Sequence, residues 1–145
     1  MIMSQRSLID IAKGPNIAYG KKDWEGVRAS VTPGVHYDEI ATHRKMNGVD
    51  PFLAVLQGWA KAFPDSKATH HNAVSGGTTV VLELTWHGTH TGPLQTPGGN
   101  IAATGKPIEI PACMIVEIGE GKAKSIRHYF DMATLMQQLG ISKAA

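Results

Sequence analysis

The hydrophobic period of this chain changes near Lys67, and that change limits its fold more than any other feature. Before this point apolar residues recur three and four positions apart, most clearly in residues 50–63, DPFLAVLQGWAKAF, which is typical of amphipathic helices. After it apolar and polar residues alternate, which is typical of strands. Helices followed by long strands predict an α+β fold, in which the helices cover one face of a mostly antiparallel sheet.

The helical part divides into several predicted segments. Residues 7–14 form a short amphipathic pattern that Gly14 and Pro15 should end, and Pro15 should begin another turn or two. Asp23 is placed as the N-cap of a helix over the following residues. We expect residues 50–63 to form the longest and most central helix, and residues 132–140 to form a short final one.

The strand part predicts two hairpins. One runs over residues 67–92 and folds about Gly76 and Gly77, and the other joins 108–118 to 124–131 through the turn GEG at 119–121. Residues 35–41, VHYDEIA, also form a strand pattern. We therefore expect a curved sheet of four to six strands wrapped by the N-terminal helices, with room inside for one small apolar ligand.

Composition excludes several classes of function. The 145 residues suit a single domain, 1–145, with a formal charge of +2 and 18% charged residues of both signs interspersed. Such a balance argues against a nucleic-acid partner, which needs clustered Lys and Arg. The single cysteine, Cys113, cannot form an internal disulfide. With no signal-peptide pattern and no long apolar stretch, we expect a soluble, cytoplasmic protein without membrane attachment.

Several motifs, in this order, resemble one known family: residues 19–39 with YGKKDWEGVRASVTPGVHYDE, then NGVDPFLAVLQGWAKAFPDSK, WHGTHTG, ATGKPIEIPACMIVEIGEGKAKSIRHYFD and LMQQLG. Together they look like the SnoaL-like polyketide cyclase, or ester cyclase, family of the NTF2-like superfamily, over residues 16–140. The resemblance implies a cone-shaped NTF2-like α+β barrel and a homodimer joined through the sheet. It also implies acid-base chemistry without a metal or organic cofactor, on a small apolar carbonyl-containing ligand.

The resemblance places the catalytic base at Asp131, where the last long strand ends in RHYFD. A turn at 119–121 puts Asp131 on the same face as Glu109, Cys113, Arg127 and Tyr129. In an apolar cone, desolvation and Glu109 would raise the pKa of Asp131, as a general base needs, whereas Arg127 would oppose both. The other interpretation is that Asp131 caps the helix that begins at Met132. Both roles are compatible.

Two further residues of the strand LELTWHGTHTG are candidates. His90, which shares a face with Trp86, could shuttle a proton or polarise a carbonyl oxygen. It could equally be a histidine hydrogen-bonded within the sheet. Trp86 and Tyr129 are the aromatic residues placed closest to the expected pocket. The remaining histidines predict no metal site, because His70 and His71 are adjacent on a strand and point to opposite faces.

The sequence departs from relatives in ways that limit the inference. Epoxide hydrolases of the same superfamily place an Arg-x-Asp pair where this chain has Gly88 and His90, and Glu117 and Arg127 also differ from the usual cyclase residues. The predicted function is a cofactor-independent cyclase or isomerase that removes a proton next to a carbonyl, with Asp131 as base. The alternatives are a non-catalytic ligand-binding module and, third, an epoxide hydrolase.

Overall fold

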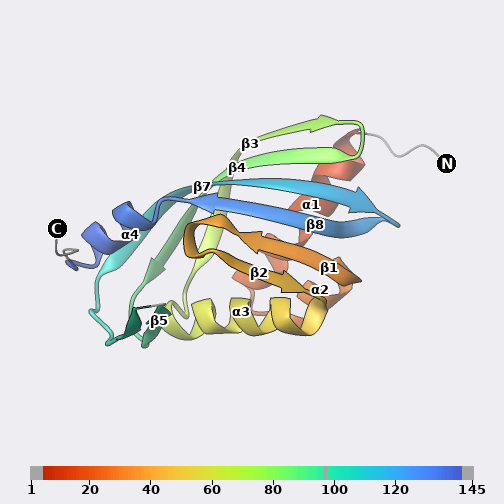
Figure 1. The fold of residues 1–145 in the computed structure, drawn as a ribbon. Coiled ribbons are helices and arrows are strands. Elements are labelled where there is room, and N and C mark those ends of the chain that lie inside the picture. Colours follow the sequence, from red (N-terminus) through yellow and green to blue (C-terminus); the bar gives the residue numbers. More distant parts are fainter. Residues whose placement is uncertain (1–4, 97, 142–145) are drawn as a thin grey trace.

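The computed structural model describes residues 5–96 and 98–141, and it contains a strongly curved sheet of six strands (Figure 1). The strand order is β2-β1-β8-β7-β4-β3, in which β1 and β8 are parallel and all other neighbours are antiparallel. The strands are β1 (Val31–Glu39), β2 (Arg44–Asn47), β3 (Lys67–Gly76), β4 (Thr79–Thr89), β7 (Pro107–Gly119) and β8 (Lys122–Phe130). The predicted α+β class and strand number are therefore confirmed.

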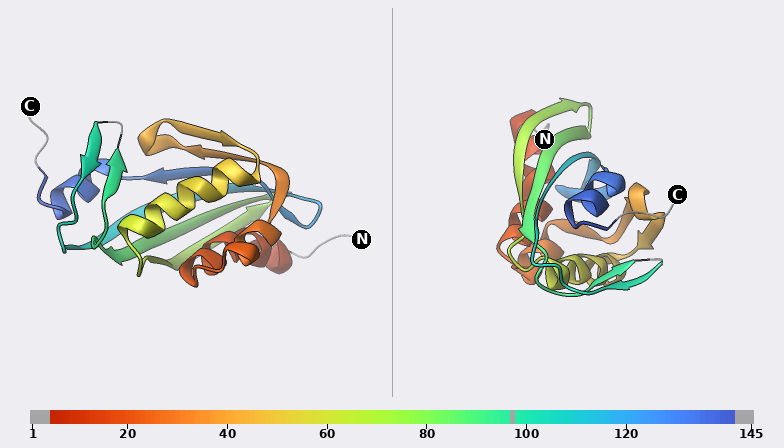
Figure 2. Two further views of the ribbon diagram at one scale, coloured as in Figure 1. Left: turned by 90° about the horizontal axis from the view of Figure 1, so that it is seen from below. Right: turned by 90° about the vertical axis from the view of Figure 1, so that its left-hand side faces the viewer.

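Three helices pack on the concave side of this sheet, as Figure 2 shows. They are α1 (Gln5–Gly20), α2 (Trp24–Ala29) and α3 (Val49–Ala62), and the short helix α4 (Met132–Gln138) follows β8. Asp23 caps α2 as predicted, since its side chain accepts a hydrogen bond from the Gly26 amide at 2.9 Å. Within the described residues no helix is both long and apolar enough to cross a membrane.

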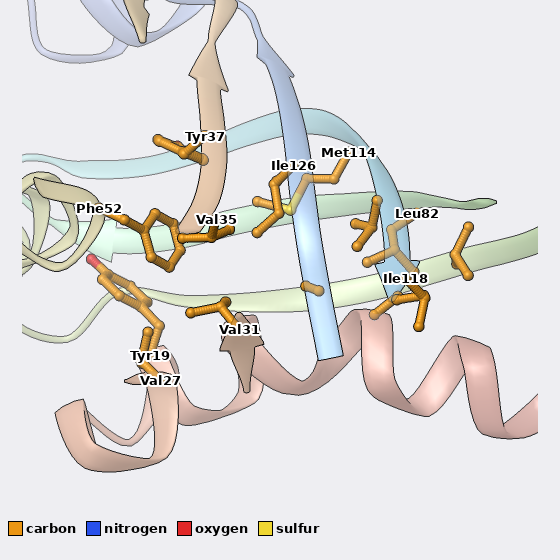
Figure 3. Close-up of a cluster of buried hydrophobic side chains, with 14 of the residues drawn as sticks. Tyr19, Val27, Val31, Val35, Tyr37, Phe52, Leu82, Met114, Ile118 and Ile126 are labelled. Carbon is orange, nitrogen blue, oxygen red and sulfur yellow. The ribbon is translucent and has the colours of Figure 1, made fainter. Parts of the chain in front are cut away.

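The core explains why α1 differs from its prediction. The sequence predicted a break at Gly14 and Pro15, but α1 runs through both and, at 16 residues, is longer than the 14 residues of α3. Leu8, Ala12 and Tyr19 lie on one stripe of this helix and are all buried. All three belong to the core cluster, so the packing continues on both sides of Pro15, and Figure 3 shows Tyr19 within this cluster. This burial outweighs the backbone hydrogen bond that a proline removes.

Three short strands were not predicted. Strand β2 pairs with β1 after a 3-10 turn, Ile40–Thr42. The connector rich in Gly and Pro forms the hairpin of β5 (Leu94–Thr96) and β6 (Gly99–Ile101). Strands of three and four residues are too short for their alternation to be distinguished from a loop. Strand β2 and the hairpin of β5 and β6 both lie beside α3 (Figure 1).

Candidate functional site

The concave side of the sheet and the helices enclose an apolar pocket. Seven aromatic residues contribute to its wall: Tyr19, Tyr37, Phe52, Trp59, Phe63, Trp86 and Phe130. About 80 Å³ is open to the centres of water molecules, whereas a single water needs about 10–15 Å³ on this measure. The pocket therefore has room for a small organic ligand.

The most unusual feature beside this pocket is a buried carboxylate. Glu39 ends β1 and is 0% exposed. Its Oε1 accepts hydrogen bonds from Arg44 Nη2 at 2.6 Å and Thr42 Oγ1 at 2.5 Å, and its Oε2 accepts from the Trp59 indole at 2.8 Å. A buried charge is tolerated where it is paired and its lone pairs are satisfied. Glu39 meets both conditions.

A chain of hydrogen bonds joins Glu39 to the pocket. The Tyr37 hydroxyl donates to Glu39 Oε2 at 3.0 Å, His128 Nδ1 lies 2.8 Å from the same hydroxyl, and the Trp86 indole donates to His128 Nε2 at 3.0 Å. An indole N–H can only donate, so Nε2 accepts and the proton of the neutral ring sits on Nδ1. Trp86, His128, Tyr37 and Glu39 thus form one directed relay, in which every donor points towards the carboxylate.

Burial sets the charge state of this relay. It lowers the pKa of His128 to about 4, although the nearby Glu39 charge acts in the opposite direction. Burial alone would raise the pKa of Glu39, but hydrogen bonds from Thr42 and the charge of Arg44 hold that pKa below its usual range. At neutral pH the pocket therefore contains an unprotonated imidazole backed by an ionised carboxylate two hydrogen bonds away.

Two smaller polar groups complete the wall. The Asn16 side-chain amide donates to His70 Nε2 at 3.1 Å and to the Met114 sulfur at 3.3 Å. A thioether is a weak acceptor, so an oxygen of a ligand would be a better partner for this amide. The Tyr19 hydroxyl lies 2.6 Å from Ser66 Oγ, and burial raises the pKa of Tyr19 to about 12. Tyr19 is therefore a neutral hydrogen-bonding group.

Asp131 lies outside this pocket. It caps α4, accepting hydrogen bonds from the Thr134 amide at 3.1 Å and the Thr134 hydroxyl at 2.6 Å. The side-chain and backbone hydrogen bonds of Thr134 lower its pKa. The expectation of a desolvated carboxylate with a raised pKa is thus wrong, because Asp131 is exposed, and the capping interpretation is confirmed. Its catalytic role stays a prediction without geometric support.

The other residues predicted to share a face with Asp131 do share one, but it is the convex face of the sheet. Cys113 pairs with Tyr129, which is 40% exposed. Arg127 pairs with Ile115 on the same face. Glu109 is 74% exposed and pairs with His87 at 3.3 Å. The residues that face the pocket from β8 are Ile126, His128 and Phe130. The grouping of the candidates on one face was therefore predicted correctly, and the side of the sheet was not.

The two candidates on β4 separate. Trp86 lines the pocket, as predicted. His90 is fully buried just beyond the strand, where its Nδ1 accepts from the Thr104 amide at 3.2 Å and its ring lies 5.2 Å from that of Phe63. Its Nε2 has no partner among the described residues, and burial lowers its pKa. His90 does not line the pocket, and its position fits the structural interpretation.

The relay residues could have been found in the sequence. In β1 the alternation Val35, Tyr37, Glu39 places the glutamate on the side of two buried residues, and in β8 His128 alternates between Ile126 and Phe130. A charged or polar residue at an inward position is the informative exception in such a pattern. No three His, Cys, Asp or Glu side chains in the described part of the chain could together hold a metal ion.

Comparison with known proteins places this geometry in a family. A profile described as SnoaL-like polyketide cyclase matches residues 13–139, and no match was found among proteins of curated function. The fold is similar to that of a candidate SnoaL-like polyketide cyclase from Jannaschia, with 16% identity, a TM-score of 0.84, and 99% of each chain covered.

Two Streptomyces structures have a similar fold. TsrD from Streptomyces laurentii has 22% identity and a TM-score of 0.82, with 97% of this chain and all of that chain covered. IdmH from Streptomyces antibioticus, a candidate polyketide cyclase, has 24% identity and a TM-score of 0.78, with 95% and 100% covered. These likenesses establish the NTF2-like fold, and the profile match over nearly the whole chain shows that the protein belongs to the SnoaL-like polyketide cyclase family.

Proposed function

We propose that the protein is a cofactor-independent acid-base enzyme of the cyclase or isomerase type, acting on a small apolar carbonyl compound in the cytoplasm. The observation that carries this proposal is the unprotonated His128 imidazole, which lines an apolar pocket and is joined through Tyr37 to the Glu39 carboxylate. Membership of the family supports the reaction class. The aromatic wall supports an apolar substrate.

In the proposed reaction the carbonyl oxygen of the substrate takes over the Trp86 indole N–H, which frees the lone pair of His128 Nε2. Nε2 then removes a proton from the carbon next to the carbonyl, and the C–H electron pair becomes the enolate. In the resulting imidazolium, Nδ1–H still donates a hydrogen bond to the Tyr37 hydroxyl. The nearby negative charge of Glu39 stabilises the positive charge of this ring. In a cyclase the enolate carbon attacks a second carbonyl, and the alkoxide regains the proton from Nε2. In an isomerase Nε2 instead delivers the proton to a different carbon of the conjugated enolate.

A panel of carbonyl substrates turned over by wild type, His128→Gln and Asp131→Asn tests this proposal. His128→Gln should lower kcat/KM by about 10²-fold or more, the range for a positioned acid-base group, whereas Asp131→Asn should retain turnover. Tyr37→Phe breaks the relay and leaves the imidazole, so it should cause a smaller loss. Full turnover by His128→Gln would refute the assignment, and loss in Asp131→Asn alone would restore Asp131 as the base.

One observation favours a second candidate, a non-catalytic binding module. His128 Nε2 is already hydrogen-bonded to Trp86, as expected of a histidine that only supports the pocket wall. In that case no carbonyl compound would be turned over, while ligands would still bind to wild type and to His128→Gln. An epoxide hydrolase has less support, because a side chain at position 88 would press against Phe63 and Ser66, and His90 does not line the pocket.

A homodimer joined through the convex face is also part of the proposal. Val74, Val81 and Ile115 are direct neighbours across three strands and form an apolar row on that face, with Val74 57% exposed. Tyr129 extends the same surface. Such a row needs a cover, and a second copy would supply one. Light scattering that gave a monomer mass at micromolar concentration would refute the dimer.

A further inference from the structure

A second cavity lies on the outer side of α3, where Arg44 and Trp59, two hydrogen-bond partners of Glu39, line it. Strands β2 and β5 flank the helix there (Figure 1). The groove between them offers about 460 Å³ to water-sized molecules. Its floor is mostly apolar, with Met46, Val55, Pro93 and Leu94, and the amides of Gln95 and Asn100 lie at one side.

The charges of this groove all have one sign. Its lining includes Arg44 and Lys61 and no carboxylate. Asp50, at the start of α3, is paired with Arg28 at 2.8 Å. Within residues 5–96 and 98–141, Lys61 forms no ion pair. Because Glu39 balances the charge of Arg44, the groove carries a net surplus of one positive charge.

Arg44 also has donor capacity to spare. Its Nε and Nη2 bond to Glu39 and Thr42, and no described residue accepts from Nη1. The guanidinium lies over the Trp59 ring at 5.8 Å, and its side chain remains 34% exposed. A guanidinium whose second edge is open can bind a further carboxylate oxygen.

From this geometry we propose that the groove is a second binding site, and that its ligand is a small amphipathic carboxylate. The apolar body would lie on Met46, Val55 and Leu94, and the carboxylate would bind Lys61 and the open edge of Arg44. This site is separate from the apolar pocket and does not depend on the proposed reaction. Trp59 lines both cavities. The NMR signal of its indole N–H, which bonds to Glu39, should therefore shift when a ligand binds in either one.

Gly58 provides a clean way to close the groove. It lies on the exposed stripe of α3 that lines the cavity, and a Cβ placed there meets no heavy atom within 4 Å. Gly58→Leu should therefore fill the groove without displacing the core. Leucine also has a higher helix propensity than glycine, so the melting temperature should hold or rise. Lys61→Met removes the surplus charge and keeps the length of the side chain.

The test is a titration of 15N-labelled protein with octanoate, followed through the resolved indole N–H signals of Trp59 and Trp86. Octanoate should shift the Trp59 signal and leave that of Trp86 in place. Octanol, which lacks the carboxylate, and acetate, which lacks the alkyl chain, should both bind more weakly. Lys61→Met should weaken octanoate binding by about two- to fivefold, as for an exposed charge pair. Gly58→Leu should abolish it.

Three outcomes would overturn the proposal. The first is no shift of the Trp59 signal at millimolar octanoate. The second is a shift of both indole signals that Gly58→Leu does not reduce, which would place the ligand in the apolar pocket. The third is a change of sedimentation in Gly58→Leu with no effect on octanoate, which would make the groove a protein interface.

Discussion

The two faces of strand β8 differ in burial and in chemistry. Ile126 and His128, on the concave face, are 3% and 6% exposed, whereas Tyr129, the next residue along, is 40% exposed on the convex face. The concave face holds the relay and the pocket, and the convex face holds most residues that the sequence suggested as functional. The difference shows that a titratable residue of this sheet acquires a shifted pKa when it lies on the face that the helices cover, because it is desolvated there.

The side-chain pairs that Glu39 and Glu109 form on the two faces should differ most in their contribution to stability. Arg44→Met leaves the Glu39 carboxylate buried without its cation, which should cost about 3–5 kcal/mol of unfolding free energy. Glu109→Gln removes the partner of His87 on the convex face, where solvent screens the pair, and should change little. Urea denaturation of both variants measures the contrast.

The double variant Arg44→Met/Glu39→Gln is the control for this experiment. It removes both charges, so it should recover much of the lost stability. A loss below about 1 kcal/mol in Arg44→Met would mean that Glu39 is protonated or hydrated once Arg44 is removed, and that the concave face does not hold a fixed charge.

Acid should destabilise the protein through His128. Its pKa is 6.5 as the reference value and about 4 in the folded state, so the unfolded chain binds more protons between these limits and stability falls as pH decreases from about 6.5 to 4. The loss amounts to about 3 kcal/mol, since each pKa unit corresponds to about 1.4 kcal/mol. The pKa of Glu39 is lowered in the folded state. Protonation of Glu39 therefore causes a further loss of stability as the pH falls below the usual pKa of a glutamate.

Urea unfolding at several pH values measures this slope, with His128→Gln as the matched variant. Without the imidazole, stability should change less between pH 6.5 and 5, and the remaining acid loss should begin lower, where carboxylates titrate. Equal slopes in wild type and variant across this window would show that His128 is hydrated and not a desolvated base.

The sequence predicted the fold well because its strongest signals are periodic. The change near Lys67, the turns at Gly77 and Glu120, and the Asp23 cap are local features that the fold retains. Which side of β8 faces the helices depends on packing from elements far away in the chain, and alternation alone does not settle it. The relay joins residues 37, 39, 86 and 128, which lie on β1, β4 and β8, and the pairing of these strands is set by contacts between distant parts of the chain.

Asp131 gives the smallest and most specific comparison. Asparagine caps a helix about as well as aspartate, so Asp131→Asn should leave the melting temperature nearly unchanged. Asp131→Ala loses both bonds to Thr134 and should lower the melting temperature by a few degrees. Because α4 supplies Leu135 to the pocket wall, fraying of this helix should also weaken ligand binding in the alanine variant. Calorimetry and ligand titration of both variants measure these effects.

If Asp131→Asn kept its melting temperature and its ligand affinity but lost about 10²-fold in turnover, the size expected for a general base, then the convex side of the strand end would carry the chemistry, and the division between the two faces would be wrong.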